Sequence, residues 1–208
     1  MVIDLPNFRF EDFVSSMENN QFWVVDDAIS KETQASLLEA AKFHFQKGEF
    51  IPAKIGKGAQ KKRVKEIRGD LIYWIEKWDD PALTYCQELY EQLLTFAKRG
   101  LYLPIKRYES HLAYYAVGTR YLKHVDRHET NPSRVLSSVL YLGDWKNGQD
   151  GELVLYLSDG RPSVSLDPSP RRLVVFDSRL VHEVRLTKVS RWSLTTWFRD
   201  DVHPLLHL

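Results

Sequence analysis

Hydrophobic side chains recur at helical spacing in two stretches of the first half of the chain. In the first stretch, Ser30 with Thr33 provides a helix start and Gly48 an end. The apolar positions between them are Leu37, Leu38, Ala41 and Phe45. The second stretch begins at Pro81 and ends at Gly100, with apolar positions at Leu83, Leu89, Tyr90, Leu93, Leu94 and Ala97. We expect two helices that cover one face of a sheet.

The remaining hydrophobic runs are short and are separated by turn residues such as Asn147-Gly148 and Asp150-Gly151. They predict strands at residues 22–25, 67–75, 107–116, 134–142, 152–157, 163–166, 172–176, 182–186 and 192–199. Many short strands with regular turns are typical of a sandwich or jelly roll. The pattern therefore predicts an α+β fold that is mainly β, with supporting N-terminal helices.

Composition favours one domain and excludes a strong global charge. With 208 residues and 43% hydrophobic content, the chain can bury one core. We expect a single domain over residues 1–208, with helical support at about 1–100 and a β core at about 101–200. A net charge of +1 gives no general attraction to nucleic acid or membrane. A single cysteine, Cys86, and an N-terminus without signal-peptide character indicate a cytoplasmic protein.

Two histidines and one aspartate form the first candidate for chemistry. In the tripeptide His124-Val125-Asp126, an extended backbone would point the first and third side chains the same way. His182 follows on a later predicted strand. Two histidines and one carboxylate are the ligands of the facial triad of non-haem Fe(II) oxygenases, which leaves open positions on the metal. The alternative interpretation is a chance tripeptide and a structural histidine.

A cation follows His182 after nine residues (191 − 182). In the alternating run that starts at Arg191, one strand face carries Arg191, Ser193, Thr195 and Trp197. A guanidinium is a planar, permanently charged donor that matches a carboxylate. It would suit the distal carboxylate of a 2-oxoacid that chelates the metal through its other end. Thr195 would add a hydroxyl donor on the same face.

Several motifs occur in an order that matches one enzyme group. They are Ile67-Arg68-Gly69-Asp70 with Trp74-Ile75, Tyr121 with His124-Val125-Asp126, Tyr141-Leu142 with Asp144-Trp145, and His182-Glu183-Val184 with Arg191-Trp192 and Thr196-Trp197. The region from Ile67 to Phe198 resembles the prolyl hydroxylases of the oxygen-sensing group and their bacterial relatives, within the 2-oxoglutarate/Fe(II) dioxygenases.

The resemblance implies a double-stranded β-helix, the jelly-roll form of this family. It implies that His124, Asp126 and His182 hold Fe(II) and that Arg191 binds 2-oxoglutarate. Tyr141 would reach the same carboxylate as Arg191, and Tyr115 would be a second tyrosine at the cosubstrate, with core packing as the alternative for Tyr115. The cofactors implied are Fe(II), 2-oxoglutarate and O2, with ascorbate as a further candidate.

On the substrate side, the resemblance places Asp70 and Arg134 near the entrance, where we expect them to pair. An ordinary surface pair is the alternative interpretation. Trp197 is a candidate substrate wall or a core residue. Residues 52–65 are rich in lysine and glycine, and in the family this segment folds over the peptide substrate as a lid. The alternatives are a solvated loop and a nucleic-acid patch, although interleaved aromatic residues are missing.

The function implied is hydroxylation of a prolyl residue in a protein, with release of succinate and CO2. By analogy with the bacterial relatives, the substrate could be a translation elongation factor. We expect a monomer with no nucleic-acid or membrane partner. Two alternatives remain open: a small-molecule or free-amino-acid hydroxylase or nucleic-acid demethylase on the same scaffold, and a metal-dependent sensor module without turnover.

Overall fold

The computed structural model describes residues 8–53, 68–78, 81–129 and 131–202. The described helices are α1 (Phe10–Asn20), α2 (Lys31–Gln46) and α3 (Pro81–Gly100). The described strands are β1 (Phe22–Val25), β2 (Ile51–Pro52), β3 (Asp70–Ile75), β4 (Arg107–Tyr115), β5 (Tyr121–His124), β6 (Arg134–Tyr141), β7 (Leu153–Tyr156), β8 (Pro162–Leu166), β9 (Leu173–Asp177), β10 (His182–Val184) and β11 (Arg191–Arg199). Most of the lysine-rich segment expected to form a lid, residues 54–65, lies outside the described residues.

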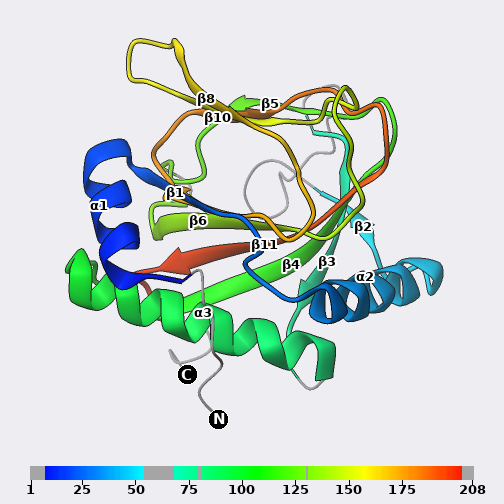
Figure 1. Ribbon diagram of the computed structural model, residues 1–208, viewed down its shortest axis with the longest axis horizontal. Coiled ribbons are helices and arrows are strands. Elements are labelled where there is room, and N and C mark those ends of the chain that lie inside the picture. The colour runs from blue at the N-terminus through cyan, green and yellow to red at the C-terminus, as the bar shows by residue number, and fades with distance from the viewer. Residues whose placement is uncertain (1–7, 54–67, 79–80, 130, 203–208) are drawn as a thin grey trace.

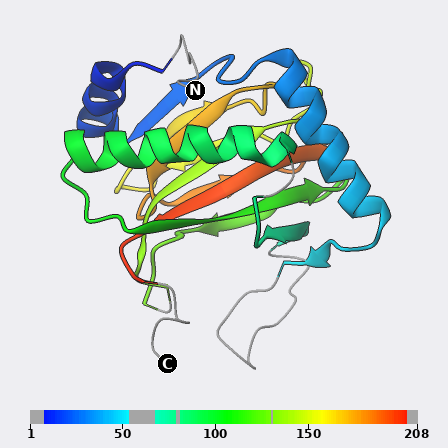
Figure 2. The same ribbon diagram turned by 90° about the horizontal axis from the view of Figure 1, so that it is seen from below.

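Two antiparallel sheets face each other across the molecule (Figure 1). The larger sheet has seven strands in the order β1-β9-β6-β11-β4-β3-β2, and the smaller has four in the order β5-β10-β7-β8. Helix α3 crosses the outer face of the larger sheet, with α1 near one end and α2 near the other (Figure 2). This architecture confirms the predicted mainly β fold of jelly-roll type with N-terminal helices.

The two predicted helices form where the sequence pattern places them. Helix α2 begins after Ser30, whose side chain accepts a hydrogen bond from the backbone N–H of Thr33 at 3.1 Å. Helix α3 runs from Pro81 to Gly100. Helix α1 was not expected from the sequence pattern. It is anchored mainly by buried Phe13 and Met17, and this pair, one helical turn apart, is too sparse a signal to stand out among polar neighbours.

Strand β11 runs through the middle of the larger sheet and is buried on both faces. Trp192, Leu194 and Phe198 belong to the hydrophobic core that includes buried residues of α3. The alternate residues Arg191, Thr195 and Trp197 line a cavity on the side of the smaller sheet. Alternation along one strand therefore separates a structural face from a face that carries polar and charged groups.

The register of the central strands arranges the cavity-facing side chains in rows across the sheet. Arg191 on β11 lies opposite Tyr115 on β4, which in turn lies opposite Asp70 on β3. Further along, Thr195 lies opposite His111 on β4 and Val139 on β6. Side chains paired in this way point to the same face of the sheet. None of the described helices has the length and apolar character that crossing a bilayer would require.

Candidate metal and cosubstrate site

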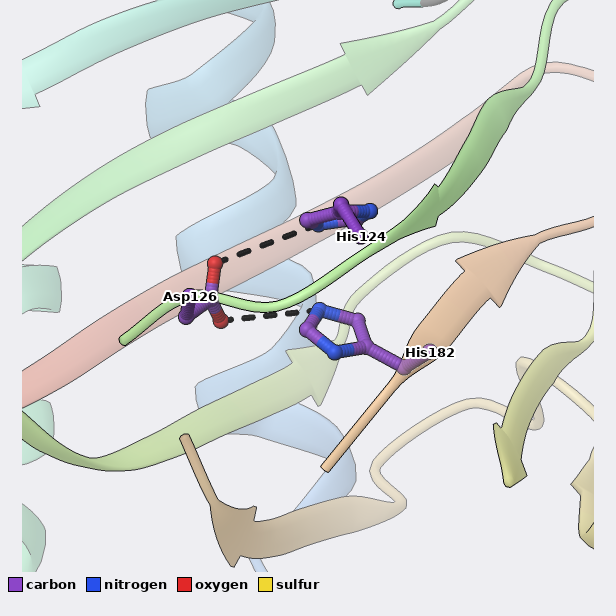
Figure 3. A group of neighbouring side chains, drawn as sticks. All are labelled: His124, Asp126 and His182. Atoms are coloured by element: carbon purple, nitrogen blue, oxygen red, sulfur yellow. Dashed lines mark ion pairs between the residues drawn. The ribbon is translucent and has the colours of Figure 1, made fainter. Parts of the chain in front are cut away.

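The three predicted metal ligands meet between the two sheets (Figure 3). One ligand atom from each of His124, Asp126 and His182 lies within 4.8 Å of the others. The Nε2 atom of His124 is 3.9 Å from one oxygen of Asp126, and the Nε2 atom of His182 is 3.5 Å from the other. His182 at the start of β10 pairs with His124 at the end of β5, so strand pairing itself brings the two imidazoles together.

The convergence of His124 and Asp126 has a different origin from the one predicted. Strand β5 ends at His124, and Asp126 lies beyond it in a bend. The backbone N–H of Asp126 donates to the carbonyl of Ser178 at 3.1 Å, and that of Arg127 donates to the same carbonyl at 2.8 Å. Docking on the turn after β9 therefore positions the carboxylate, and the expectation of an extended tripeptide was wrong.

Both imidazoles are oriented by a carbonyl in their own segment. His124 donates from Nδ1 to the carbonyl of Leu122 at 2.7 Å, and His182 donates from Nδ1 to the carbonyl of Leu180 at 2.9 Å. These bonds leave each Nε2 unprotonated in the neutral ring and directed to the centre of the triad. Burial, followed by the neighbouring His182, lowers the pKa of His124 to about 3. At neutral pH His124 is therefore the uncharged imidazole that a metal requires.

Asp126 is held as a carboxylate in a buried position. Burial opposes its ionisation, but His182, His124, Arg134 and a hydrogen bond from Ser137 outweigh burial, and the pKa of the carboxyl lies below its usual value. The hydroxyl of Ser137 donates to Asp126 at 2.6 Å and lies 2.8 Å from the hydroxyl of Ser178. Two imidazoles and one ionised carboxylate fit the donor set of a non-haem Fe(II) site.

Arg191 provides a cation deep in the same cavity. The residue is only 5% exposed, and its Nε atom has no hydrogen-bonding partner among the described residues. The hydroxyls of Tyr141 and Ser193 are likewise buried without a partner in the described part of the chain. A buried charge is costly unless an opposite charge or hydrogen bonds compensate it. A small carboxylate ligand beside Arg191 would compensate this charge, so the residues present fit 2-oxoglutarate.

Tyr115 lies beside this cation. The guanidinium carbon of Arg191 is 4.9 Å from the ring centre of Tyr115 and 4.8 Å from that of Tyr141. Burial raises the pKa of Tyr115, so its phenol stays protonated and able to donate. Thr195 lines the same cavity and lies four residues (195 − 191) further along β11 than Arg191.

The predicted pair between Asp70 and Arg134 is not formed. Asp70 instead accepts two hydrogen bonds from Arg68, at 2.7 and 2.9 Å. Arg134 contacts Glu109 at 3.2 Å and Asp126 at 3.9 Å. The reason is position on the sheet. Asp70 belongs to the row of Arg191, whereas Arg134 lies at the far end of β6.

Arg134 nevertheless packs against Trp197, a residue of the cavity wall, because β6 is irregular next to it. Leu136 pairs with Phe198 and Arg134 with Arg199, so two residues on β6 advance against one on β11. This β-bulge places Val135 in the core next to the helices. The guanidinium carbon of Arg134 lies 3.3 Å from the ring centre of Trp197. Trp197 thus stands between the charged group and the cavity.

Four further polar residues of the cavity wall were given no role by the sequence prediction. They are Arg68, His111, Tyr121 and Ser137. For His111 a signal existed, because alternation backwards from Tyr115 through Ala113 places it on the same strand face. A larger hollow of about 460 Å³ lies elsewhere on the surface, near Phe22, Lys123 and Arg179. This larger hollow contains none of the triad ligands, so the volume of a hollow does not identify the metal site in this protein.

We predict that Ser137→Ala weakens metal binding about 10-fold to 100-fold, because Asp126 loses the donor that orients its carboxylate. Titration of the metal-free protein with Co(II), followed by visible absorption, measures the change. Ser138→Ala is the matched control, since its buried side chain alternates to the face covered by the helices. Equal affinities in the two variants would contradict the role given to Ser137.

Comparisons with known proteins agree with this geometry. Residues 110–199 match the model of the 2OG-Fe(II) oxygenase superfamily. The chain is 27% identical over 203 residues to a hypoxia-inducible factor prolyl hydroxylase of Caenorhabditis elegans and 28% identical over 199 residues to human Egl nine homolog 1. Each alignment covers 91% of this chain, but only 28% and 46% of the respective relative, so the chain spans less than half the length of these relatives.

Two solved structures are similar over almost their full length. A prolyl-4-hydroxylase of Pseudomonas putida has a TM-score of 0.83 and 30% identity, covering 91% of this chain and 98% of that one. A prolyl hydroxylase of Trichoplax adhaerens, solved with a peptide of the hypoxia-inducible factor oxygen degradation domain, has a TM-score of 0.82 and 25% identity, covering 96% and 92%. The fold, the triad and these similarities together establish that the chain belongs to the 2OG-Fe(II) oxygenase superfamily, with relatives that are prolyl hydroxylases.

Proposed function

We propose that this protein is a 2-oxoglutarate- and Fe(II)-dependent dioxygenase that hydroxylates prolyl residues in a protein substrate and releases succinate and CO2. The observation that carries the proposal is Arg191, which lies in the same cavity as the triad and whose buried Nε atom has no hydrogen-bonding partner among the described residues. A triad alone would suit several metal functions. A triad with a buried cation beside it suits a reaction that consumes a dicarboxylate.

In this proposal His124, Asp126 and His182 hold the iron. Bound Fe(II), with O2, supplies the oxidising power that breaks a C–H bond while 2-oxoglutarate is decarboxylated. The remaining tasks belong to the protein. Arg191 and Tyr141 bind the distal carboxylate, and no side chain acts as acid or base.

The walls of the cavity assign further roles. Tyr115 and Thr195 border the cosubstrate, and Tyr115 donates through its protonated phenol. Trp197, with the guanidinium of Arg134 on its ring, forms the wall on the substrate side. Asp70, fixed by Arg68, completes the row next to Arg191. Asp70 therefore belongs to the cavity wall near Arg191, whereas Arg134 packs on Trp197 at the other end of the cavity.

A prolyl residue is the proposed target because of the similarity to the P. putida prolyl-4-hydroxylase over 98% of its length. The T. adhaerens prolyl hydroxylase forms a complex with a peptide, which favours a protein as the substrate here as well. A translation elongation factor stays the candidate substrate by analogy. We further propose a single domain over residues 1–208, ascorbate as an accessory reductant, a cytoplasmic location and a monomer without nucleic-acid partners.

The proposal is tested by oxygen incorporation into protein. The enzyme is loaded anaerobically with iron and 2-oxoglutarate, mixed with cell lysate and exposed to isotopically heavy O2. Mass spectrometry should then locate one heavy oxygen atom on specific prolines, and samples without 2-oxoglutarate should lack it. Succinate formation without any modified protein would favour a small-molecule hydroxylase. The absence of both succinate and modified protein would favour the sensor module.

A further inference from the structure

His111 is a buried polar residue in the cavity wall for which the roles above give no use. Its side chain on β4 lines the cavity that contains the triad. The residue is 1% exposed, and its Nδ1 atom has no hydrogen-bonding partner among the described residues. Buried polar atoms in native proteins are almost always paired, so an unpaired nitrogen on a residue that lines a ligand cavity points to a ligand group.

The strand register separates His111 from the carboxylate site. On β4, His111 lies four residues (115 − 111) before Tyr115, the residue opposite Arg191. Four residues along a strand span roughly 13 Å. A hydrogen bond from His111 therefore cannot serve the carboxylate that Arg191 binds. The residue opposite His111 on β11 is Thr195, and the residue opposite it on β3 is Trp74.

The neighbours of His111 form a row of packed side chains from the cavity wall towards the surface. Its ring centre lies 4.9 Å from that of the buried Trp197 and 5.1 Å from that of Trp74. Trp74 is 37% exposed, so this row of side chains reaches solvent. Two aromatic rings of this row flank His111, which provides the hydrogen-bonding group between them. A polypeptide segment with an apolar ring and polar backbone groups matches such a surface.

The charge state of His111 suits an uncharged partner. Burial, and then the charges of Arg68 and Arg134, hold the pKa of His111 well below its usual range, and Asp126 offsets this in part. The ring is therefore neutral, with one nitrogen as donor and the other as acceptor. A peptide group offers the complementary carbonyl and N–H. A proline has no backbone N–H of its own, so its neighbouring carbonyls and the N–H of adjacent residues are the groups available.

We propose that His111 is a substrate-positioning residue that hydrogen-bonds the peptide backbone beside the target proline. This role rests on the proposed function, because it presumes that a prolyl peptide enters the cavity. It assigns to β4 a contribution to substrate selection that is separate from the binding of iron and 2-oxoglutarate.

A pair of variants with similar volume and different polarity tests the role. His111→Met removes the hydrogen-bonding group, and His111→Gln keeps a donor and an acceptor. The probe is a synthetic pool of pentapeptides with proline fixed at the centre, used beside the cell lysate. Hydroxyproline is measured by mass spectrometry, and 2-oxoglutarate affinity is measured by calorimetry. Uncoupled succinate formation is measured in samples that contain no peptide. His44→Met is the control, since His44 pairs with Glu49 and stacks on Tyr73 away from the cavity.

We expect His111→Met to lower hydroxylation at low pool concentration about fivefold to tenfold, the effect of one lost hydrogen bond. Its 2-oxoglutarate affinity and uncoupled succinate formation should stay within about twofold of the wild type, and hydroxylation by His111→Gln should fall clearly less. If His111→Met does not fold, His111→Phe takes its place, because a planar ring between the tryptophans preserves packing.

Four outcomes would overturn the inference. Unchanged hydroxylation in the apolar variant would make His111 a packing residue. A parallel loss of 2-oxoglutarate affinity would assign it to the cosubstrate. Equal losses in the Gln and apolar variants would exclude hydrogen bonding as the cause. If the wild-type enzyme modified neither pool nor lysate, the proposed function would fail and the inference with it.

Discussion

His182→Ala is expected to abolish 2-oxoglutarate turnover, with a loss greater than about 100-fold, and to release the iron on desalting. Removal of one of three ligands costs more than the loss of an outer partner, which typically reduces metal affinity 10-fold to 100-fold. The fold should persist, because the strands are held by cores that do not depend on the imidazole. Succinate formation measures turnover, metal analysis after desalting measures iron retention, and circular dichroism measures whether the fold persists.

The control for this experiment is His44→Ala, which removes a histidine outside the cavity. His124→Ala should behave like His182→Ala. Asp126→Glu should also impair turnover, since an added methylene displaces the carboxylate by more than the roughly 0.5 Å that a metal site tolerates. Normal succinate formation in either histidine variant would end the assignment of the triad.

Arg191→Lys is expected to raise the KM for 2-oxoglutarate about 10-fold to 100-fold. An ammonium replaces a two-pronged guanidinium, and hydrogen bonds to charged groups are worth about 1.5–3 kcal/mol. Tyr141→Phe should raise the same KM less, because one hydroxyl is lost and the cation stays. Initial rates of succinate formation at varied 2-oxoglutarate concentration measure both effects.

Arg172→Lys provides the matched control for the arginine substitution, since Arg172 binds Asp26 at the surface and not the cavity. Its KM for 2-oxoglutarate should equal that of the wild type. Should Arg191→Lys and Tyr141→Phe also leave this KM unchanged, the carboxylate would bind elsewhere and the buried cation would need another explanation.

The strongly periodic elements were predictable because burial alone decides them. Helices α2 and α3 and most strands formed within a few residues of the expected ranges. Strand β5 was missing from the predicted strands, since it has only four residues, Tyr121–His124, and none is fully buried. A short strand stabilised by its neighbours leaves little trace in its own hydrophobic pattern.

The site was also predictable only in part. The three metal ligands and Arg191 could be identified from the sequence, whereas contacts that depend on the register between strands could not. The bulge at Val135, which places Arg134 against Trp197 of the cavity wall, depends on pairing with β11 and has no local signature. The partner of Asp70 was mistaken for a different reason. Arg68 lies only two residues before Asp70, so alternation along an extended segment already places both side chains on one face.

The three ligands differ in how much of the fold each needs. Each imidazole takes its orientation from a carbonyl two residues upstream, so a short segment suffices to set it. Asp126 takes its place from Ser137 on β6 and from Ser178 after β9, which are distant in sequence. Metal binding is therefore coupled to the docking of the β5–β6 connection on the larger sheet. A bound iron would stabilise the assembled sandwich, because a chain in which this connection is undocked lacks the third ligand.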